Sequence, residues 1–161
     1  MEIEKKFLVK ELPENLDNYD VYQLEQGYLC SYPTVRIRKC DEDYFLTYKS
    51  KGTSRKGCKN VIVNNEVELE LNENSYETLK AKIDGRLVVK DRYVIPIQDD
   101  LVAEMDIFKD YLEGLKMVEV EFDNEDQALN FIPPEWFGKD VSDDHRFRNV
   151  NLASIDSLEE L

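Results

Sequence analysis

Histidine and cysteine are scarce in this sequence of 161 residues, and the shortage limits which metal sites it can form. His145 is the single histidine, so a metal site built from several histidines is excluded. The three cysteines, Cys30, Cys40 and Cys58, form no CxxC motif, which excludes a zinc ribbon and a paired disulfide framework. Unpaired cysteines are typical of a reducing compartment, and we expect a cytoplasmic protein. Any bound metal has to be held by carboxylates, which suit hard cations such as Mg²⁺ or Mn²⁺.

Long hydrophobic runs and an excess of positive charge are also absent. No apolar run reaches the roughly 18 residues of a membrane-spanning helix, and charges interrupt the N-terminal segment MEIEKKFLVK too often for a signal peptide. The chain has 21 Lys and Arg against 35 Asp and Glu, which gives a net charge of -14. An acidic surface repels nucleic acids and anionic lipids, so we expect no nucleic-acid and no membrane partner.

Alternation of polar and apolar residues, the period of a β-strand, covers most of the chain. It predicts eight strands, over residues 2–9, 21–30, 34–40, 43–50, 61–71, 86–95, 101–108 and 116–123. Eight antiparallel strands suffice to close a barrel. No repeat or linker divides the chain, so we predict a single domain over residues 1–161. Its fold class is mainly β (α+β), an eight-stranded antiparallel closed β-barrel, or tunnel, with a few covering helices.

Helical patterns are limited to three segments. Residues 73–83 and 125–132 each follow an asparagine that can cap a helix. The last twenty residues, from Ser142, are predicted to be helical with a break near Asn149. Residues 51–60 are polar and contain glycine, which predicts a loop.

Charges that recur at positions i and i+2 are the most informative pattern, because such residues project from one face of a strand. The acidic sets are Glu2/Glu4, Glu66/Glu68/Glu70, Glu104/Asp106 and Glu119/Glu121, and the basic sets are Arg36/Arg38, Lys49/Lys51 and Lys90/Arg92, with Lys6 on the first strand. A single pair of this kind is typical of the solvent face of a half-buried sheet. If all sets faced solvent, acids on neighbouring strands would repel one another without compensation. If they face a barrel interior, acids meet bases, and the helices cover the outward apolar faces.

A charged interior of this kind cannot stay dry and empty, because unpaired buried charge is costly. It has to contain water, metal ions and a charged ligand. Clustered carboxylates favour divalent cations, and clustered lysines and arginines favour a polyanion. The two clusters together predict a metal-phosphate site.

The first strand, Glu2-Ile3-Glu4-Lys5-Lys6, resembles the E-x-E-x-K signature of the CYTH superfamily, also called triphosphate tunnel metalloenzymes. Further segments similar to that family follow in order: QGYL at 26–29, VRIR at 35–38, LTYKS at 46–50, EVELE at 66–70, VKDRY at 89–93, EMD at 104–106, VEVEF at 118–122, IPPEWFG at 132–138 and DHRFRN at 144–149. The resemblance covers nearly the whole chain. It implies an eight-stranded tunnel and Mg²⁺- or Mn²⁺-dependent chemistry on inorganic triphosphate, nucleoside triphosphates or thiamine triphosphate.

Residue roles follow from this resemblance and from side-chain chemistry. The predicted metal ligands are Glu2, Glu4, Asp106, Glu119 and Glu121. The predicted substrate-binding residues are Lys6, Arg36, Arg38, Lys49, Lys90 and Arg92, since arginine and lysine bind phosphate oxygens. The predicted catalytic residues are Lys6, Tyr28, Glu66, Glu68 and Lys90.

Several of these roles have alternatives. A second metal ion, or a carboxylate such as Glu66 or Glu68, would activate the attacking water. Tyr28 either donates a hydrogen bond to phosphate or packs, and Arg92 alternatively forms a structural salt bridge. We place Arg146 on a helix surface rather than at a tunnel mouth.

Two features depart from the family pattern. Asn64 and Asn65 stand where related bacterial proteins often carry an arginine, and the loop 51–63 is longer than usual. The sequence leaves open whether Arg55 or Lys56 supplies the missing positive charge.

The leading functional prediction is metal-dependent hydrolysis of a triphosphate, with inorganic tripolyphosphate first and nucleoside triphosphates second, releasing phosphate. One alternative is a class IV-type adenylate cyclase, which makes cyclic AMP and pyrophosphate from ATP, although no adenine pocket is marked in the sequence. The other is a non-catalytic polyphosphate-binding module, which would not need an acidic cluster. A homodimer also stays open, since paired barrels occur among CYTH proteins.

Overall fold

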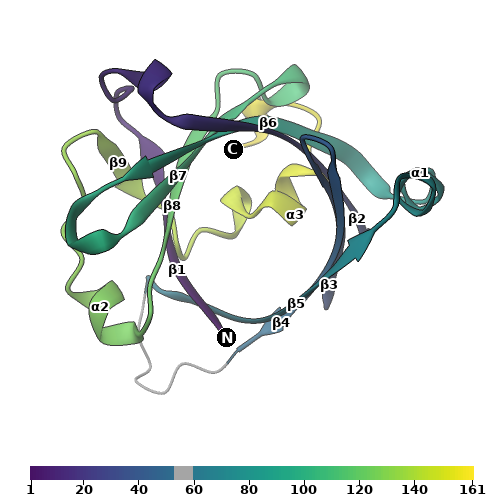
Figure 1. Ribbon diagram of the computed structural model, residues 1–161, viewed down its shortest axis with the longest axis horizontal. Coiled ribbons are helices and arrows are strands. Elements are labelled where there is room, and N and C mark those ends of the chain that lie inside the picture. The colour runs from purple at the N-terminus through teal and green to yellow at the C-terminus, as the bar shows by residue number, and fades with distance from the viewer. Residues whose placement is uncertain (53–59) are drawn as a thin grey trace.

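Eight antiparallel strands form a closed barrel in the computed structural model, which describes residues 1–52 and 60–161 (Figure 1). The strands are β1 (Glu2–Val9), β2 (Asp20–Cys30), β3 (Thr34–Cys40), β4 (Asp43–Lys51), β5 (Ile62–Leu71), β6 (Asp84–Pro96), β7 (Val102–Phe108) and β8 (Lys116–Glu121). They are hydrogen-bonded in the order β5-β4-β3-β2-β6-β7-β8-β1, and β1 pairs with β5 to close the barrel. The predicted fold class is therefore confirmed, and each predicted strand exists with small shifts at its ends.

A ninth strand, β9 (Phe137–Asp140), was not predicted. It pairs with Phe7 and Val9 of β1. Strand β5 pairs with the same edge of β1, but nearer the start of that strand, at Glu2 to Glu4. The strand is short, and its register shifts between Phe7 and Val9, so it leaves no period-2 pattern in the sequence.

Two helices pack outside the barrel, as predicted, but both are shorter than predicted. Helix α1 (Glu73–Lys80) begins at Asn72, whose side chain accepts a hydrogen bond from the backbone N–H of Ser75 at 2.8 Å. Helix α2 (Glu125–Leu129) begins at Asn124. Helix α1 lies against β3 and β4, and α2 lies against β1, where they cover apolar side chains.

The C-terminal segment, residues 141–153, enters the barrel and lies across its interior (Figure 1). The segment from Ser142, predicted to be helical with a break near Asn149, contains three short helices: a 3-10 helix (His145–Phe147), the one-turn helix α3 (Asn149–Leu152) and a 3-10 helix (Leu158–Glu160). Phe147 and Leu152 are buried against Val88 and Phe108, which belong to β6 and β7. Val88 and Lys90 lie on the same, inward face of β6. The interior of the barrel is therefore charged at Lys90 and apolar at Val88, and the C-terminal segment covers the apolar part.

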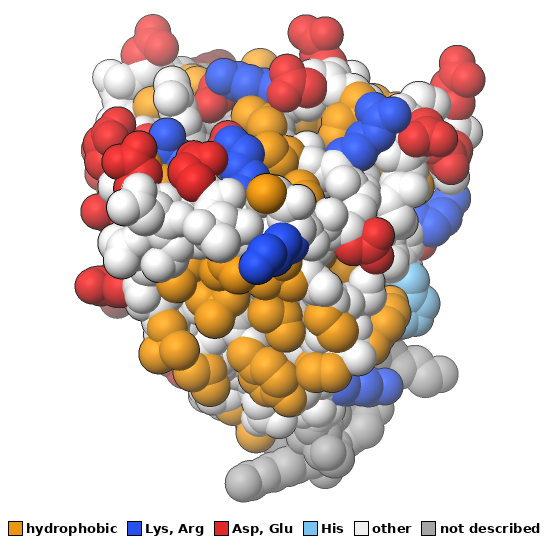
Figure 2. Space-filling view, turned by 90° about the vertical axis from the view of Figure 1, so that its right-hand side faces the viewer, with side chains coloured by type: hydrophobic (Ala, Val, Ile, Leu, Met, Phe, Trp, Pro, Cys, Tyr) orange, Lys and Arg blue, Asp and Glu red, His pale blue; other side chains and the backbone are white. Residues whose placement is uncertain are grey.

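The outer face of the barrel carries apolar side chains, because these alternate along each strand with the charged side chains that point inward. Figure 2 shows a large apolar area on one side of the molecule, and the exposed Tyr48, Val67 and Leu69 lie on the outer face of β4 and β5. Among the described residues, no helix has the length and hydropathy to cross a membrane.

Candidate active site

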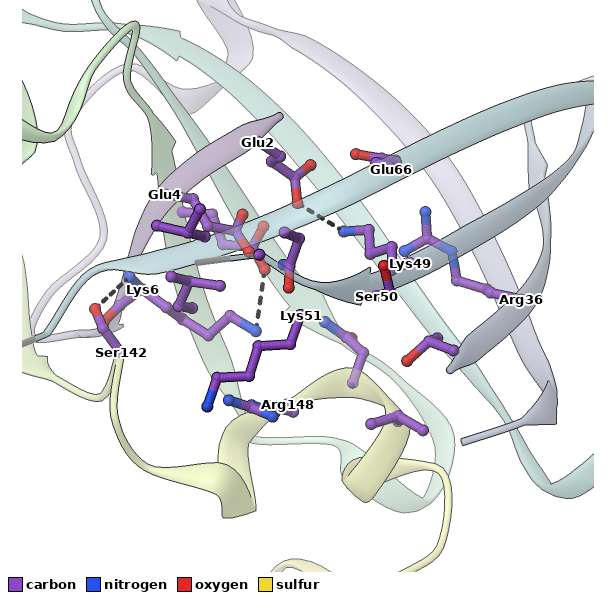
Figure 3. Close-up of a pocket in the computed structure, with 18 of the residues that line it drawn as sticks. Glu2, Glu4, Lys6, Arg36, Lys49, Ser50, Lys51, Glu66, Ser142 and Arg148 are labelled. Atoms are coloured by element: carbon purple, nitrogen blue, oxygen red, sulfur yellow. Dashed lines mark hydrogen bonds and ion pairs between the residues drawn. The ribbon is translucent and has the colours of Figure 1, made fainter. Parts of the chain in front are cut away.

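One cavity of about 1220 Å³ occupies the charged part of the barrel (Figure 3). Twelve predicted site residues line it: Glu2, Glu4, Lys6, Tyr28, Arg36, Arg38, Lys49, Glu66, Lys90, Arg92, Glu119 and Glu121. They come from β1 to β6 and from β8. The alternating charges of these strands therefore face inward and converge, whereas Glu68 and Asp106 do not line the cavity.

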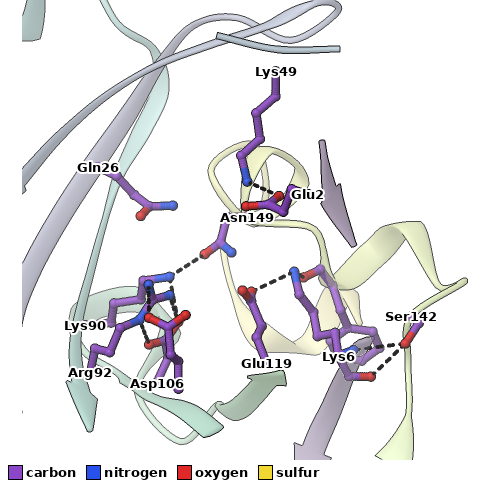
Figure 4. Close-up of polar contacts among 12 residues, drawn as sticks. Glu2, Lys6, Gln26, Lys49, Lys90, Arg92, Asp106, Glu119, Ser142 and Asn149 are labelled. Carbon is purple, nitrogen blue, oxygen red and sulfur yellow. Dashed lines mark hydrogen bonds and ion pairs between the residues drawn. The ribbon is translucent and has the colours of Figure 1, made fainter. Parts of the chain in front are cut away.

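Asp106 occupies a different place from the one predicted for a metal ligand. Its two carboxylate oxygens accept hydrogen bonds from Arg92 at 2.8 and 2.9 Å, and Lys90 Nζ lies 2.7 Å from Oδ2 (Figure 4). Burial would raise the pKa of this carboxyl, but Arg92 and Lys90 lower it below its ordinary value. Asp106 is buried under the cavity wall, where it fixes two cations that do reach the cavity.

Arg92 also forms the salt bridge that was its alternative role. Its Nη1 lies 3.1 Å from Glu104 Oε2. Burial lowers the pKa of Lys90 to about 8, with Asp106 opposing the shift. Arg92 can form these ion pairs and also line the cavity, because its guanidinium has five N–H donors.

Lys6, on β1, lies across the cavity from Lys90, and its ammonium group also contacts two partners. Its Nζ lies 3.3 Å from Glu119 Oε1 and donates to the backbone oxygen of Phe147 at 3.3 Å. Burial would raise the pKa of Glu119, but Lys6 together with Arg92 and other cations lowers it well below its ordinary value. Glu119, a predicted metal ligand, is therefore already charge-compensated.

Glu2 and Glu66 share a hydrogen bond at the β1–β5 closure. Lys49 Nζ lies 3.0 Å from Glu2 Oε1. Burial would raise the pKa of Glu2, but the hydrogen bond with Glu66 and the charge of Lys49 lower it. Burial and the same hydrogen bond raise the pKa of Glu66 to about 7. The two carboxyl groups thus hold one proton between them near neutral pH.

Glu4 is a buried acid without a basic partner within the described ranges 1–52 and 60–161. It lies directly across from Glu121 in the β1–β8 register. Burial and the negative charges of Glu119 and Glu2 raise the pKa of Glu4 well above its ordinary value. Burial and the charges of Glu2 and Glu104 likewise raise the pKa of Glu121. Lys49 and Lys6 oppose the shift of Glu4, and Lys49 opposes that of Glu121, but burial and the neighbouring acids outweigh them, so negative charge is in excess at this corner.

This corner has the donor chemistry of a hard-cation site. Glu2, Glu4 and Glu121 all line the cavity and offer only carboxylate oxygens. Over the part of the chain that the structure describes, no three acids are already arranged as a metal centre.

Arg36 and Arg38 project from β3 into the same cavity. Arg38 Nη2 lies 3.1 Å from Glu68 Oε2. Since Glu68 does not line the cavity, Glu66 is the candidate base on the cavity wall. Arg36 donates to Thr47 Oγ1 at 3.3 Å and has no acidic partner among the described residues. The buried Nε atoms of both arginines have no hydrogen-bond partner, which leaves donors for an anion.

The sequence assigned no role to three polar residues that the structure places on the cavity wall, for Arg148 and Asn149, or behind it next to Tyr28, for Gln26. Gln26 is wholly buried, and its Nε2 donates to the Tyr28 hydroxyl at 2.9 Å. Asn149 Oδ1 accepts a hydrogen bond from Lys90 Nζ at 3.1 Å, and Arg148 lines the cavity (Figures 3 and 4). Two of the three belong to the C-terminal segment, whose path through the barrel leaves no local sequence signal.

The structure also shows where Arg146 and Asn64 lie. Arg146 lies on the surface, as predicted, with Nη2 2.6 Å from Asp144 Oδ2. Arg55 and Lys56 lie outside the described residues. Asn64, which stands where an arginine was expected, lines the cavity and pairs in register with Glu2.

Comparison with known proteins gives consistent relatives. The chain is 38% identical over 156 residues to an inorganic triphosphatase of Nitrosomonas europaea, covering 94% of this chain and 96% of that protein. It is 31% identical over 157 residues to an inorganic triphosphatase of Acetivibrio thermocellus, covering 94% and 92%. A crystal structure of an inorganic triphosphatase superposes with a TM-score of 0.71 at 35% identity, covering 98% and 97% of the two chains.

More distant structures share the fold alone. A Hippeastrum protein assigned as an adenylyl cyclase, with a dominant triphosphatase activity, matches with a TM-score of 0.61 at 16% identity, covering 80% of this chain and 83% of that chain. No family model matches the sequence.

Proposed function

We propose that this chain, which belongs to the inorganic triphosphatases of the CYTH superfamily, hydrolyses inorganic tripolyphosphate in its barrel cavity with the help of Mg²⁺ or Mn²⁺. One observation carries the proposal: cations from β3, β4 and β6 and carboxylates from β1, β5 and β8 line a single cavity. A polyanion needs the first set, and a hard divalent cation needs the second.

Glu2, Glu4 and Glu121 are the residues that would hold the cation. The support is that burial and neighbouring acids raise the pKa of both Glu4 and Glu121, which face each other in the β1–β8 register, and a cation would offset this unfavourable negative charge. When bound, the cation supplies charge neutralisation and orientation of phosphate oxygens. Glu119 and Asp106 serve instead as counter-ions of Lys6, Lys90 and Arg92.

Arg36, Arg38 and Lys49 bind the phosphate chain from the β3–β4 wall. Arg36 contributes most, because it has no acidic partner within the described residues and needs no ion pair to be broken. Arginine also provides the bidentate geometry that fits two phosphate oxygens. Lys6 and Lys90 neutralise charge on the transferring phosphoryl group from the opposite side of the cavity.

Glu66 accepts the proton of the attacking water. It lines the cavity and is hydrogen-bonded to Glu2 rather than held by an arginine, as Glu68 is. The water oxygen forms a bond to a terminal phosphorus while the bond from that phosphorus to the bridging oxygen breaks. The products are orthophosphate and pyrophosphate, and Lys90 stabilises the negative charge that develops on the departing oxygen.

A substrate panel tests this proposal. Purified protein is given tripolyphosphate, ATP, thiamine triphosphate or pyrophosphate, with Mg²⁺, Mn²⁺ or EDTA, and orthophosphate, pyrophosphate and cyclic AMP are measured. We expect metal-dependent release of orthophosphate, fastest from tripolyphosphate. Arg36→Gln should reduce kcat/KM by about 100-fold, since an ionic hydrogen bond is worth about 1.5–3 kcal/mol. Arg86→Gln, at an exposed ion pair with Asp156, is the matched control.

Other outcomes would select another function. Cyclic AMP with pyrophosphate from ATP would establish a cyclase, and tight binding of tripolyphosphate without turnover in either metal would establish a binding module. A cytoplasmic location, the absence of nucleic-acid and membrane partners, and a homodimer stay predictions. Fractionation, binding assays with DNA, RNA and anionic vesicles, and light scattering test them in turn.

A further inference from the structure

The C-terminal segment contacts both lysines of the cavity from inside the barrel. The backbone oxygen of Phe147 accepts a hydrogen bond from Lys6 Nζ at 3.3 Å, and Asn149 Oδ1 accepts one from Lys90 Nζ at 3.1 Å. Lys6 belongs to β1 and Lys90 to β6, so the segment connects two parts of the barrel wall. The residue between the two contacts is Arg148.

The backbone at Arg148 is firmly held. The residue is extended (φ -70, ψ 136) between the 3-10 helix and α3. Its carbonyl oxygen accepts hydrogen bonds from the N–H groups of Asn151 and Leu152, both at 2.9 Å. The flanking Phe147 and Leu152 are buried. These contacts fix where the side chain starts, and Figure 3 shows it among the side chains that line the cavity.

The guanidinium of Arg148 has no ion-pair partner in the described part of the chain. Most cations that line the cavity have one, since Lys6, Arg38, Lys49, Lys90 and Arg92 each pair with an acid. Within residues 1–52 and 60–161, the cavity cations without such a pair are Arg36, Arg148 and the exposed Lys51 at the end of β4. The nearby surface residue Arg146 pairs with Asp144. A cavity arginine that stays unpaired in a chain of net charge -14 has donors to offer an anion.

We propose that Arg148 is an additional substrate-binding residue, which contacts phosphate oxygens of the triphosphate from the C-terminal segment. Phe147 and Asn149 are positioning residues, because their contacts with Lys6 and Lys90 set the place of Arg148 between them. The inference rests on the proposed triphosphatase function and adds an arginine that comes from the C-terminal segment inside the barrel rather than from one of the barrel strands.

Variants of two arginines in one short segment test the inference. Arg148→Gln should raise the KM for tripolyphosphate about tenfold or more while kcat stays within about threefold, because a ground-state contact is lost. Arg148→Lys should recover part of the loss, since it keeps the charge without the bidentate geometry. Arg146→Gln, which lies outside the cavity, should keep the wild-type KM. The Kd for tripolyphosphate is measured in parallel by calorimetry.

The outcomes separate this inference from the proposed function. A KM and Kd of Arg148→Gln equal to those of the wild type would overturn the role of Arg148 and leave the triphosphatase function intact. If the wild type binds tripolyphosphate but does not hydrolyse it, the proposed function fails, and the Kd ratio still decides the role of Arg148. If Arg148→Gln unfolds, Arg148→Lys decides by the same two constants, because it retains the long side chain.

Discussion

Lys90 Nζ lies 2.7 Å from Asp106 Oδ2, and both side chains are almost completely shielded from solvent, at 1% and 2% exposure. The same carboxylate accepts two hydrogen bonds from Arg92. One acid therefore compensates two cations that reach the cavity from β6. Arg92 pairs with Glu104 as well, so the β6 cations form one compensated grouping, whereas Glu4 and Glu121 form a second grouping with an excess of acid.

Replacing Asp106 tests the first of these groupings. Asp106→Asn leaves two buried cations without their main counter-ion, so we expect the free energy of unfolding in EDTA to fall by about 3–5 kcal/mol. Asp156→Asn, at an exposed ion pair with Arg86, should cost about 0–1 kcal/mol. Urea unfolding measures both. A stable Asp106→Asn protein with weakened metal affinity would instead restore the metal-ligand role predicted from the sequence.

Glu4→Gln should have opposite effects on stability and on metal binding. Without a cation, removing the carboxyl of Glu4 relieves its burial penalty and its repulsion by Glu119 and Glu2, and stabilises the fold by about 0.2–1 kcal/mol. The concentration of Mg²⁺ or Mn²⁺ that gives half-maximal activity should rise about tenfold or more, because one charged ligand is lost. Unfolding in EDTA and metal titration of activity give the two numbers. Glu135→Gln, at an exposed position, should change neither, and an unchanged metal requirement in Glu4→Gln would remove Glu4 from the proposed site.

The shared proton of Glu2 and Glu66 predicts a pH dependence of stability in the metal-free protein. The folded pKa of Glu66 is about 7, above the ordinary value of 4.5, so the folded state binds the proton more tightly than the unfolded state. Its contribution to stability is present below pH 4.5 and is lost as the pH rises through 7. Glu66→Gln imitates the protonated form at every pH. In EDTA, the variant should match the wild type at low pH and become more stable above pH 7, and a pH-independent difference in unfolding free energy would refute the shared proton.

The strands and the direction of their charged faces could be predicted because both are local properties. A strand shows its period within a few residues, and charges at i and i+2, such as Arg36 and Arg38, necessarily share a face. The barrel then follows, because only closure brings the acids of β1 and β8 and the cations of β3 and β6 to one cavity.

Contacts between distant segments could not be predicted in this way. Asp106 has the same spacing from Glu104 as Glu121 has from Glu119, yet the barrel register places Asp106 opposite Arg92 and Glu121 opposite Glu4. Arg146 and Arg148 are two residues apart, and the sequence does not distinguish their roles. Because the C-terminal segment enters the barrel between them, Arg146 forms a surface ion pair and Arg148 lines the cavity.

The position of that segment depends on Gly85, which supplies the last prediction. Gly85 has a φ of +76, and a Cβ atom there would lie 2.4 Å from the backbone oxygen of Ala153. That oxygen also accepts a hydrogen bond from the N–H of Arg86 at 2.8 Å, so it cannot move away without breaking the contact. Gly85→Ala should therefore displace the segment and weaken the Asn149 contact with Lys90.

Gly114→Ala separates this displacement from simple backbone strain. Gly114 also has a positive φ, +102, but a Cβ atom there would only meet a Leu158 methyl group at 3.5 Å. Left-handed strain should cost each variant about 1–2 kcal/mol, and the clash with Ala153 should add to the loss in Gly85→Ala, as urea unfolding measures. Because only Gly85→Ala moves the C-terminal segment, only that variant should also show a several-fold rise in the KM for tripolyphosphate. Equal KM values for the two variants would mean that substrate binding does not depend on the position of this segment.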